Sequence, residues 1–319
     1  MRFALAPMIA IALAAAFATP AFAKLPVKTV KIAEKHKQYE IDVDYPKTGN
    51  KSIDEDIADW AELQVAAFKD DAAGNDGDSA SGPYQLGIGF QVARNDDKMF
   101  AVLFTYSTYE GGAHPNTVFQ TMNFLMPDGW HVYLQEIFTE DGLKKISKLA
   151  IADLDKQLVG PDSMDEKDWI ARGAGPDWDN FGAFVLLPDA LDISYAPYNV
   201  APYAAGGQET KIPLAALKPF LRANWRAPQP SFDCAKASTA VEKTICSDAN
   251  LARQDRNVAE AYRQKTSGSD EATKKPIRDA QRAWLASRAT RCGAKTGAAG
   301  VACLTSLYDA RLTALTAAP

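Results

Sequence analysis

The four cysteines of this chain all lie in its last quarter, at Cys234, Cys246, Cys292 and Cys303. An even number of cysteines confined to a short segment is typical of a small domain held by disulfides, which persist in oxidising compartments outside the cytoplasm. This distribution predicts a chain of two parts, of which only the second is stapled. It also predicts export, so a secretory signal is expected at the other end of the chain.

The N-terminus has the composition of a secretory signal peptide, assigned to residues 1–23. Met1-Arg2 is basic, Phe3–Phe17 is an almost unbroken apolar run, and Ala21-Phe22-Ala23 places small residues at the −3 and −1 positions of a cleavage site. A membrane anchor is the alternative, but the apolar run falls short of the ~20 residues that span a bilayer. We expect cleavage near Ala23 and, since Lys24 follows instead of a cysteine, no lipid attachment. The mature protein is then expected to be soluble, not membrane-spanning, and periplasmic or secreted.

Acidic and basic residues are unevenly divided between the two parts. Residues 24–229 carry 31 Asp and Glu against 20 Lys and Arg, whereas residues 230–319 carry 9 against 14. An acidic surface attracts cationic partners, although solubility alone would also explain the charge. The basic residues of the second part are interleaved with acids and lack an aromatic stacking platform, so the composition argues against nucleic-acid binding.

Residues 24–226 show the periodicities of an α+β domain. Alternating apolar and polar residues predict strands, and apolar residues three and four apart predict helices. Strands in runs separated by a few helices favour a mixed or antiparallel sheet over a doubly wound one. Hairpin turns are expected at Asn95–Asp97 and Pro127–Gly129, and an exposed loop at Asp70–Gly82. The expected strands are Val27–Ile32, Tyr39–Tyr45, Tyr84–Ala93, Met99–Tyr109, Val118–Met126, Trp130–Tyr133, Phe184–Leu187, Leu191–Tyr195 and Gln208–Ile212, and the expected helices are Asn50–Phe68, Leu143–Leu158 and Leu214–Asn224.

Residues 231–319 predict a four-helix domain, joined to the first part by a proline-containing linker at 227–230. Thr239 and Glu242 have the spacing of a capping box, and Asp248 can cap the helix that follows. A third helix is expected from about Glu271, and a fourth carries a 3.6-residue apolar repeat. The expected faces are Val241 and Ile245; Leu251, Val258, Ala261 and Tyr262; Ile277, Gln281, Trp284, Leu285 and Arg288; and Leu304, Leu307, Tyr308, Arg311, Leu312 and Leu315.

The four cysteines allow three pairings. We favour Cys234–Cys246 and Cys292–Cys303, because each would close a short loop against one end of a helix. A domain of this size gains from such staples, each worth roughly 2–4 kcal/mol. A metal site is disfavoured, since no C-x-x-C occurs and the nearest histidine, His131, lies in the first part. The same lack of close spacing disfavours a redox pair.

Two segments of the first part have sequences that are more distinctive than those of ordinary loops. They are Tyr109–Thr117 (YEGGAHPNT) and Leu191–Gly207 (LDISYAPYNVAPYAAGG), the latter followed by Ile212-Pro213-Leu214. Together they resemble the extracytoplasmic domain of RsiV, a lysozyme-sensing anti-sigma factor, a module that also accompanies certain peptidoglycan deacetylases. The resemblance covers most of residues 27–224. It implies a mixed α/β module exposed to the cell wall, in some members a lysozyme receptor, and does not by itself imply catalysis.

Candidate partner-binding residues lie in these two segments. The glycine pair allows backbone conformations closed to other residues, and Pro115 restricts His114 to extended geometry, so a shaped loop between two strands is expected. His114 could carry a proton or bind a ligand, although bracing the loop is the commoner role. Tyr195, Tyr198 and Tyr203 would form either a rigid surface for protein or glycan contact or a core wrap around the sheet edge. The candidates are Glu110, Gly111, Gly112, His114, Asn116, Tyr198 and Tyr203.

A second pattern spans the cysteine-containing part. It comprises Phe232-Asp233-Cys234, Glu242, Ile245-Cys246, Leu251, Asp255, Tyr262, Gln281–Leu285 (QRAWL), Arg288, Cys292, Cys303-Leu304, Tyr308 and Arg311-Leu312. This pattern resembles the LprI-type lysozyme-inhibitor domain, whose members are exported and whose namesake inhibits lysozyme. Its polar helix positions are candidate contact residues, or alternatively an internal set of salt bridges and hydrogen bonds: Asp255, Gln281, Arg282 and Arg288.

Two resemblances to lysozyme-related modules favour an exported envelope protein that binds and inhibits lysozyme or another cationic wall-active protein. The alternative is a scaffold that binds peptidoglycan or the envelope without inhibiting. An enzyme is disfavoured, because the chain has three histidines, no G-x-S-x-G, no phosphate loop and no histidine pair at metal-ligand spacing. Acid pairs such as Asp177 with Asp179 could act on a glycan, but such pairs are common in exposed loops. We therefore expect no catalytic residue, no metal and no cofactor.

Overall fold

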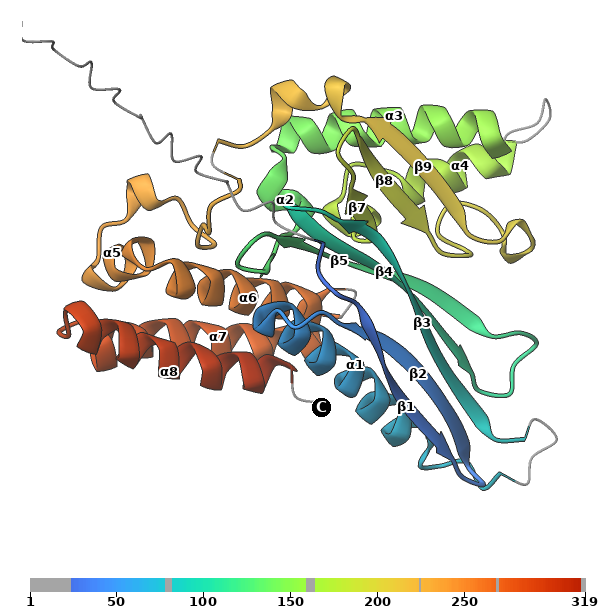
Figure 1. Cartoon of the computed structure of the whole chain (residues 1–319), viewed down its shortest axis with the longest axis horizontal. Helices are drawn as coiled ribbons and strands as arrows, with labels where there is room; N and C mark the ends of the chain where they lie inside the picture. Colours follow the sequence, from blue (N-terminus) through green and yellow to red (C-terminus); the bar gives the residue numbers. More distant parts are fainter. Residues whose placement is uncertain (1–23, 78–81, 159–163, 224, 268–269, 317–319) are drawn as a thin grey trace, which may run out of the picture.

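The computed structural model describes residues 24–77, 82–158, 164–223, 225–267 and 270–316, so the expected signal peptide at 1–23 lies outside the described residues. A large sheet, a small sheet and their covering helices are followed by a helical bundle (Figure 1). This arrangement confirms the expected α+β class with a C-terminal helical part. The strands of the large sheet are β1 (Lys28–Lys35), β2 (Tyr39–Lys47), β3 (Tyr84–Asn95), β4 (Met99–Tyr109), β5 (Asn116–Leu125) and β6 (Trp130–His131).

The six strands of the large sheet lie side by side in chain order. All neighbours are antiparallel except β2 and β3, which are parallel. A parallel pair needs a crossover connection, and α1 (Lys51–Ala72) supplies it. The helix packs one apolar stripe on one face of the sheet, against residues such as Val43, Ile88 and Phe104. The stripe consists of Ile53, Ile57, Ala61, Val65, Phe68 and Ala72.

The start of α1 is fixed by a side-chain cap. Asn50 Oδ1 accepts hydrogen bonds from the N–H groups of Ser52 at 3.1 Å and Ile53 at 3.3 Å. Its Nδ2 donates to the carbonyl of Pro127, at 3.0 Å, in the turn between β5 and β6. Gly129 of that turn has φ +72°, and a Cβ atom there would lie 2.5 Å from Asn50 Oδ1. The turn expected at Pro127–Gly129 therefore requires glycine for both conformational and steric reasons.

The small sheet consists of β7 (Phe184–Leu186), β8 (Ala190–Tyr195) and β9 (Gln208–Pro213), all antiparallel. One edge of β7 pairs with β8, while the other meets polar side chains of β5. Asn123 Nδ2 donates to the carbonyl of Phe184 at 2.8 Å, and Asn123 Oδ1 accepts from the N–H of Leu186 at 3.1 Å. Thr121 Oγ1 accepts from the N–H of Phe184 at 2.9 Å. Side chains thus satisfy the strand edge where the two sheets meet.

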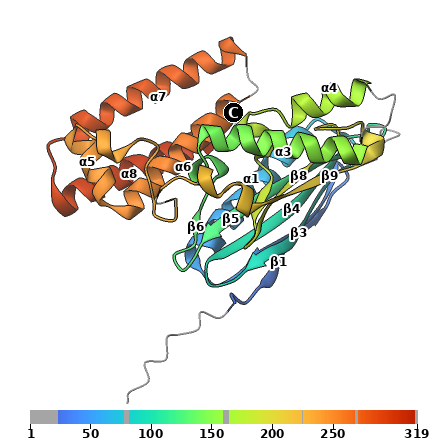
Figure 2. The same cartoon turned by 90° about the horizontal axis from the view of Figure 1, so that it is seen from above.

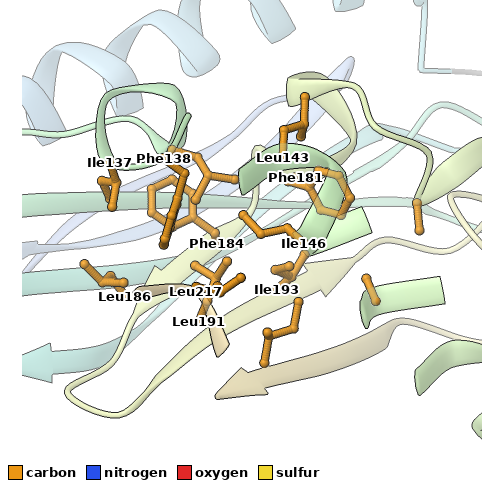
Figure 3. Packing of buried hydrophobic residues seen from close by; sticks show 14 of the residues in the cluster. Ile137, Phe138, Leu143, Ile146, Phe181, Phe184, Leu186, Leu191, Ile193 and Leu217 are labelled. Atoms are coloured by element: carbon orange, nitrogen blue, oxygen red, sulfur yellow. The ribbon is translucent and has the colours of Figure 1, made fainter. Parts of the chain in front are cut away.

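Helices α3 (Glu140–Leu158) and α4 (Met164–Gly173) cover the small sheet, and the short α2 (Leu134–Ile137) leads into them (Figures 1 and 2). The core between α3 and the sheet is apolar, and Figure 3 shows side chains from helices, strands and loops converging there. Phe138, Ile146, Phe181, Leu191 and Ile193 are fully buried in it. Single helical turns lie at Trp178–Phe181 and Tyr203–Ala205.

The C-terminal bundle contains α5 (Ala240–Ser247), α6 (Ala249–Thr266), α7 (Glu271–Cys292) and α8 (Gly297–Thr316), preceded by a single turn at Cys234–Lys236. Both expected disulfides are present, Cys234–Cys246 and Cys292–Cys303. Thr239 and Glu242 form the expected capping box, and the backbone hydrogen bonds that Glu242 accepts lower its pKa to about 2. The bundle has its own core of Val241, Ile245, Leu251, Val258, Ala261, Cys292, Leu304, Leu307, Tyr308 and Leu315.

Helix α6 of the bundle lies next to β6 of the large sheet (Figure 2). Arg256 of α6 forms an ion pair with Glu136 of α2 at 2.8 Å. Arg263 pairs with Asp179, and Gln135 donates to Glu260 at 3.1 Å. The bundle therefore directs some of its basic side chains at acids of the first part.

Some expectations from the sequence are wrong. The segment expected as a helix at Leu214–Asn224 forms only single turns at Leu214–Ala216 and Lys218–Phe220, because Pro219 lacks the N–H that a longer helix needs; Asn224 lies outside the described residues. The strands of the first part form two sheets instead of one. Helix α4 was not expected, and α1 extends to Ala72, into the segment expected as a loop.

The burial of two side chains settles one open alternative, at Tyr195, and corrects one expectation, at Leu285. Tyr195 is 2% exposed, because the alternation along β8 directs it into the core, so only Tyr198 and Tyr203 of the aromatic run reach the surface. Leu285 is 41% exposed and does not share the buried stripe of α7. In α7 the stripe is Ile277, Gln281, Trp284 and Arg288, all half-buried.

Candidate functional site

Four aromatic rings form a partly exposed cluster. The helix and loops that carry them lie at the end of the molecule away from the bundle (Figure 1). His114 comes from the β4–β5 loop, Trp169 from α4, and Tyr198 and Tyr203 from the β8–β9 loop. The rings of His114 and Tyr203 stack with centroids 3.5 Å apart and planes 15° apart. The ring of Tyr198 lies 5.5 Å from that of Tyr203 and 6.5 Å from that of Trp169. We call these four residues the aromatic platform.

Hydrogen bonds fix the orientation of His114 within the platform. Its Nδ1 lies 2.9 Å from the carbonyl oxygen of Pro115, and its Nε2 lies 3.1 Å from the hydroxyl of Tyr198. A carbonyl oxygen only accepts, so Nδ1 carries the proton of the neutral ring and Nε2 accepts from the tyrosine hydroxyl. His114 thus braces the loop and holds Tyr198, with both ring nitrogens engaged.

The backbone of Tyr198 adopts φ +72°, a left-handed conformation that is unfavourable for a non-glycine residue. Helix α4 holds this conformation, because the indole N–H of Trp169 donates to the carbonyl of Tyr198 at 2.7 Å. The N–H of Tyr198 also donates to the carbonyl of Ala201, at 3.1 Å. At Gly173 a Cβ atom would lie 1.9 Å from the carbonyl oxygen of Asn199, so α4 approaches the loop as closely as only glycine permits.

A groove of about 500 Å³ runs over the face of the large sheet opposite α1, across β1 to β4. Its floor includes Gly87, and its walls carry acidic, basic and amide side chains. Pro115, the neighbour of His114, also lines it, so the loop that carries one ring of the aromatic platform borders the groove. We call it the sheet groove; its lining includes Lys31, Asp42, Gln85, Gly87, Ser107 and Pro115.

The remaining candidates of the first part lie in the β4–β5 loop and at its end. Glu110, Gly112 and Asn116 are exposed, and Gly111 has φ +84°, as expected for a glycine that shapes the loop. The structure thus brings together His114, Tyr198 and Tyr203, which are far apart in the sequence. Sequence reasoning missed Trp169, since its segment showed no pattern of its own; a tryptophan in an otherwise polar helical segment was the available signal.

The polar candidates of the bundle form an internal network. Asp255 is buried; its Oδ1 accepts from the hydroxyl of Tyr308 at 2.5 Å and from Arg288 at 3.2 Å. Its Oδ2 accepts from the backbone N–H of Ser231 at 2.7 Å. The guanidinium of Arg288 also stacks over Trp284, at 4.9 Å from its centroid. This network ties the segment that enters the bundle to α6, α7 and α8.

The other two candidates of the bundle differ from each other. Gln281 Oε1 accepts from Arg311 Nε at 2.8 Å, which links α7 to α8. The side chain of Arg282 is 73% exposed, and its guanidinium lies 3.9 Å from Asp279. Of these four bundle candidates, Arg282 is the one directed outward.

Ionisable groups gather where the bundle meets the first part. Burial raises the pKa of Glu136 although Arg256 opposes the rise, and burial also raises the pKa of Glu260. Burial lowers the pKa of His131 to about 4, so this ring is neutral at pH 7. Over the described ranges, no three His, Cys, Asp or Glu side chains are grouped as metal ligands would be, and no helix is both long and apolar enough to cross a bilayer.

Comparison with known proteins assigns the parts of the chain. The model of the family "Lysozyme inhibitor LprI" matches residues 234–315. The C-terminal part is an LprI-type domain. In front of it, the model of the deacetylase PdaC family matches residues 32–117, and that of DUF3298, a family of unknown function, matches residues 135–215. The PdaC match covers most of β1 and all of β2 to β4 of the large sheet, and the DUF3298 match covers the small sheet and the helices that pack on it.

Individual relatives match part of the chain. The peptidoglycan-N-acetylmuramic acid deacetylase PdaC of Bacillus subtilis is 25% identical over 200 residues, which are 61% of this chain and 42% of that enzyme. The chain thus spans about two fifths of the curated relative it matches. A crystal structure of a DUF3298 family protein from Pseudomonas aeruginosa shares the fold with a TM-score of 0.51 and 19% identity, over 64% of this chain and 97% of that one. A DUF3298 structure from Bacteroides fragilis has a TM-score of 0.47 and 19% identity, with coverage of 64% and 96%.

Proposed function

We propose that this protein binds lysozyme and inhibits it, as a non-catalytic partner. The match of residues 234–315 to the LprI lysozyme inhibitor family carries the proposal. The matched segment contains all four cysteines, and both of its disulfides close. The expected signal peptide and these disulfides support action outside the cytoplasm, where lysozyme and the cell wall are found.

The charge of the first part supports a cationic partner. Lysozymes are typically basic and cut glycans with two carboxylates in an open cleft. An excess of acids over residues 24–229 would speed encounter with such a protein. The bundle is basic, but its Arg256 and Arg263 are paired with Glu136 and Asp179, so part of this positive charge is neutralised within the molecule.

The internal network limits which bundle residues can make the contact. Asp255 and Arg288 bond to each other and to Tyr308, so they hold the bundle together. Arg282 is 73% exposed and is paired only at 3.9 Å with the exposed Asp279, so it could reach a carboxylate of the lysozyme cleft. We therefore assign Arg282 to the contact in preference to the other bundle candidates.

A turbidity assay of cell-wall lysis tests the proposal. Residues 24–319 are titrated against a lysozyme, and the complex is measured by calorimetry. We expect inhibition by the unaltered chain and a weaker effect for Arg282→Ala. Lys243→Ala is the matched control, because it removes an exposed positive charge from α5 of the same domain. Undiminished lysis at large molar excess, with no complex detected, rules the function out.

The absence of catalysis is part of the proposal. The relative named as a deacetylase is matched over only 42% of its length, which gives no ground for transferring its activity. Release of acetate from peptidoglycan by residues 24–319 would contradict this part of the proposal without bearing on lysozyme binding.

A further inference from the structure

We propose that the aromatic platform and the sheet groove together form a binding site for an oligosaccharide. The platform would stack on sugar rings, and the groove would hold the polar groups of neighbouring sugars. This site lies in the first part of the chain, at the end away from the LprI-type domain (Figure 1). It goes beyond lysozyme inhibition and does not depend on it.

The rings of the platform are arranged as sugar-stacking surfaces are. His114 and Tyr203 are near-parallel, with planes 15° apart, and Trp169 and Tyr198 are 17° apart. An aromatic ring carries negative charge on its face, and the C–H side of a pyranose ring presents weakly positive hydrogens to it. The polar ends of His114, Trp169 and Tyr198 are already hydrogen-bonded, so the outward faces of these ring pairs need little reordering on binding.

The conformation of Tyr198 indicates that the position of its ring matters. Its φ of +72° would suit glycine or asparagine, yet a tyrosine occupies the position with 49% of its surface exposed. An exposed ring contributes little to the core, so burial does not offset the strain. Strained residues held in place by surrounding structure cluster at binding sites, and here Trp169 and Gly173 of α4 hold the loop.

The sheet groove has the polar character that a carbohydrate requires. Its walls carry Lys31 and Asp42, which form an ion pair with each other, together with Gln85 and Ser107. These side chains place hydrogen-bond donors and acceptors around the groove. The floor is open at Gly87, where an added Cβ would meet no atom within 4 Å. A chain of sugars entering over Gly87 would pass Pro115 and reach the platform next to it.

A protein partner fits this site less well. The centre of a protein interface is apolar and depleted of charge. Among the described residues, the exposed large hydrophobic side chains are Val27, Val118, Tyr198 and Leu285, and of these only Tyr198 belongs to the platform. The charged lining of the groove and the single exposed tyrosine match a glycan better than a protein surface.

Isothermal titration calorimetry of residues 24–319 tests the inference, with chitotetraose, cellotetraose and maltotetraose as probes and no lysozyme present. We expect at least one tetrasaccharide to bind, with affinity at least tenfold lower in Tyr198→Asn and in Gly87→Val. Asparagine tolerates the left-handed conformation, and valine suits a strand position with free space, so both variants should fold. Leu285→Ala and Gln91→Val are the controls, one exposed hydrophobic on α7 and one exposed position on the same strand as Gly87. Thermal unfolding confirms that all four variants are folded.

The inference is overturned if none of the three tetrasaccharides binds, or if the two controls lose as much affinity as the two site variants. A Tyr198→Asn variant that loses lysozyme binding, with no tetrasaccharide bound by the unaltered chain, would show the platform to be a protein contact instead. Because calorimetry with sugars and the lysis assay are independent, failure of one leaves the result of the other unchanged.

Discussion

The side chain of Asn123 pairs with the backbone of Phe184 as a neighbouring strand would, with Nδ2 donating to the carbonyl oxygen at 2.8 Å. Asn123 is completely buried, and its Oδ1 accepts from the next N–H on the same edge of β7, at 3.1 Å. One amide thus replaces two rungs of a strand ladder and joins the small sheet to the large one. The position of the β8–β9 loop, and with it the platform, depends on this junction.

Asn123→Ala should lower the free energy of unfolding by about 2–4 kcal/mol, because two buried backbone groups lose their partners. Urea denaturation measures the change. Gln91→Ala removes the same amide from an exposed position of β3 and should have little effect. An equal loss in the two variants would show that the junction contributes nothing special to stability.

Tyr198→Asn should raise the free energy of unfolding by about 0.5–1 kcal/mol, since asparagine adopts the left-handed conformation with less strain. The gain is read from the shift in the thermal midpoint. Tyr203→Asn, at a residue without positive φ, is the comparison and should give no gain. A destabilised Tyr198→Asn variant would mean that the ring stabilises the fold more than its backbone strains it.

Arg288→Met should destabilise the bundle by about 2–4 kcal/mol, because it leaves the buried carboxylate of Asp255 without its cation. Arg282→Met changes the same side chain at an exposed position on the same helix, and its effect should stay within about 0.5 kcal/mol. Chemical denaturation followed by helical circular dichroism distinguishes the two. Similar small effects in both variants would show that the network around Asp255 is not needed for stability.

Asp56→Asn should stabilise the protein at pH 7 and have no such effect at pH 4. Burial raises the pKa of Asp56 from 3.8 to about 6, against the opposing charge of Arg253 on α6 and with a smaller rise from Asp59 and Glu55 on α1. The folded protein therefore keeps this proton in the window where the unfolded chain loses it. The contribution of Asp56 to the free energy of unfolding therefore falls as pH rises from about 4 to 6 and stays constant above that range.

Urea denaturation at the two pH values measures this effect, for which we expect a gain of about 1 kcal/mol at pH 7. Asp97→Asn, at an exposed turn position, serves as the control for the change of charge. A gain in Asp56→Asn that is the same at both pH values would contradict the assignment of the raised pKa.

Reduction of the disulfides should destabilise the bundle selectively. Each bond closes a loop of 11 or 12 residues in sequence separation, and loops of this size contribute about 2–4 kcal/mol. Calorimetry with and without a reductant should show a lower midpoint for unfolding of the bundle, while the cysteine-free first part is unaffected. A scan unchanged by the reductant would mean that the helical core alone sustains the domain.

Much of the local structure follows from patterns that act over a few residues. The apolar stripe of α1, the capping box at Thr239 and Glu242, and the hairpin turn at Asn95–Asp97 were all predicted, because periodicity and capping depend on neighbours in the sequence. The helix expected at Leu214–Asn224 is wrong, because Pro219 breaks the helical hydrogen bonding although the apolar spacing continues past it. Leu285 has the spacing of a buried residue, but no element covers it.

The sequence by itself predicted the division of the chain, the cysteine pairing that we favoured, and the segments that carry the candidate residues. Only the tertiary structure decided that His114, Tyr198 and Tyr203 meet, that Trp169 joins them, and that Asp255 and Arg288 are bonded inside the bundle. The reason is physical. Spacing along the chain fixes which face of a helix or strand a residue occupies, whereas its neighbours across the fold depend on how the sheets and helices pack, as the pairing of Asn123 with β7 shows.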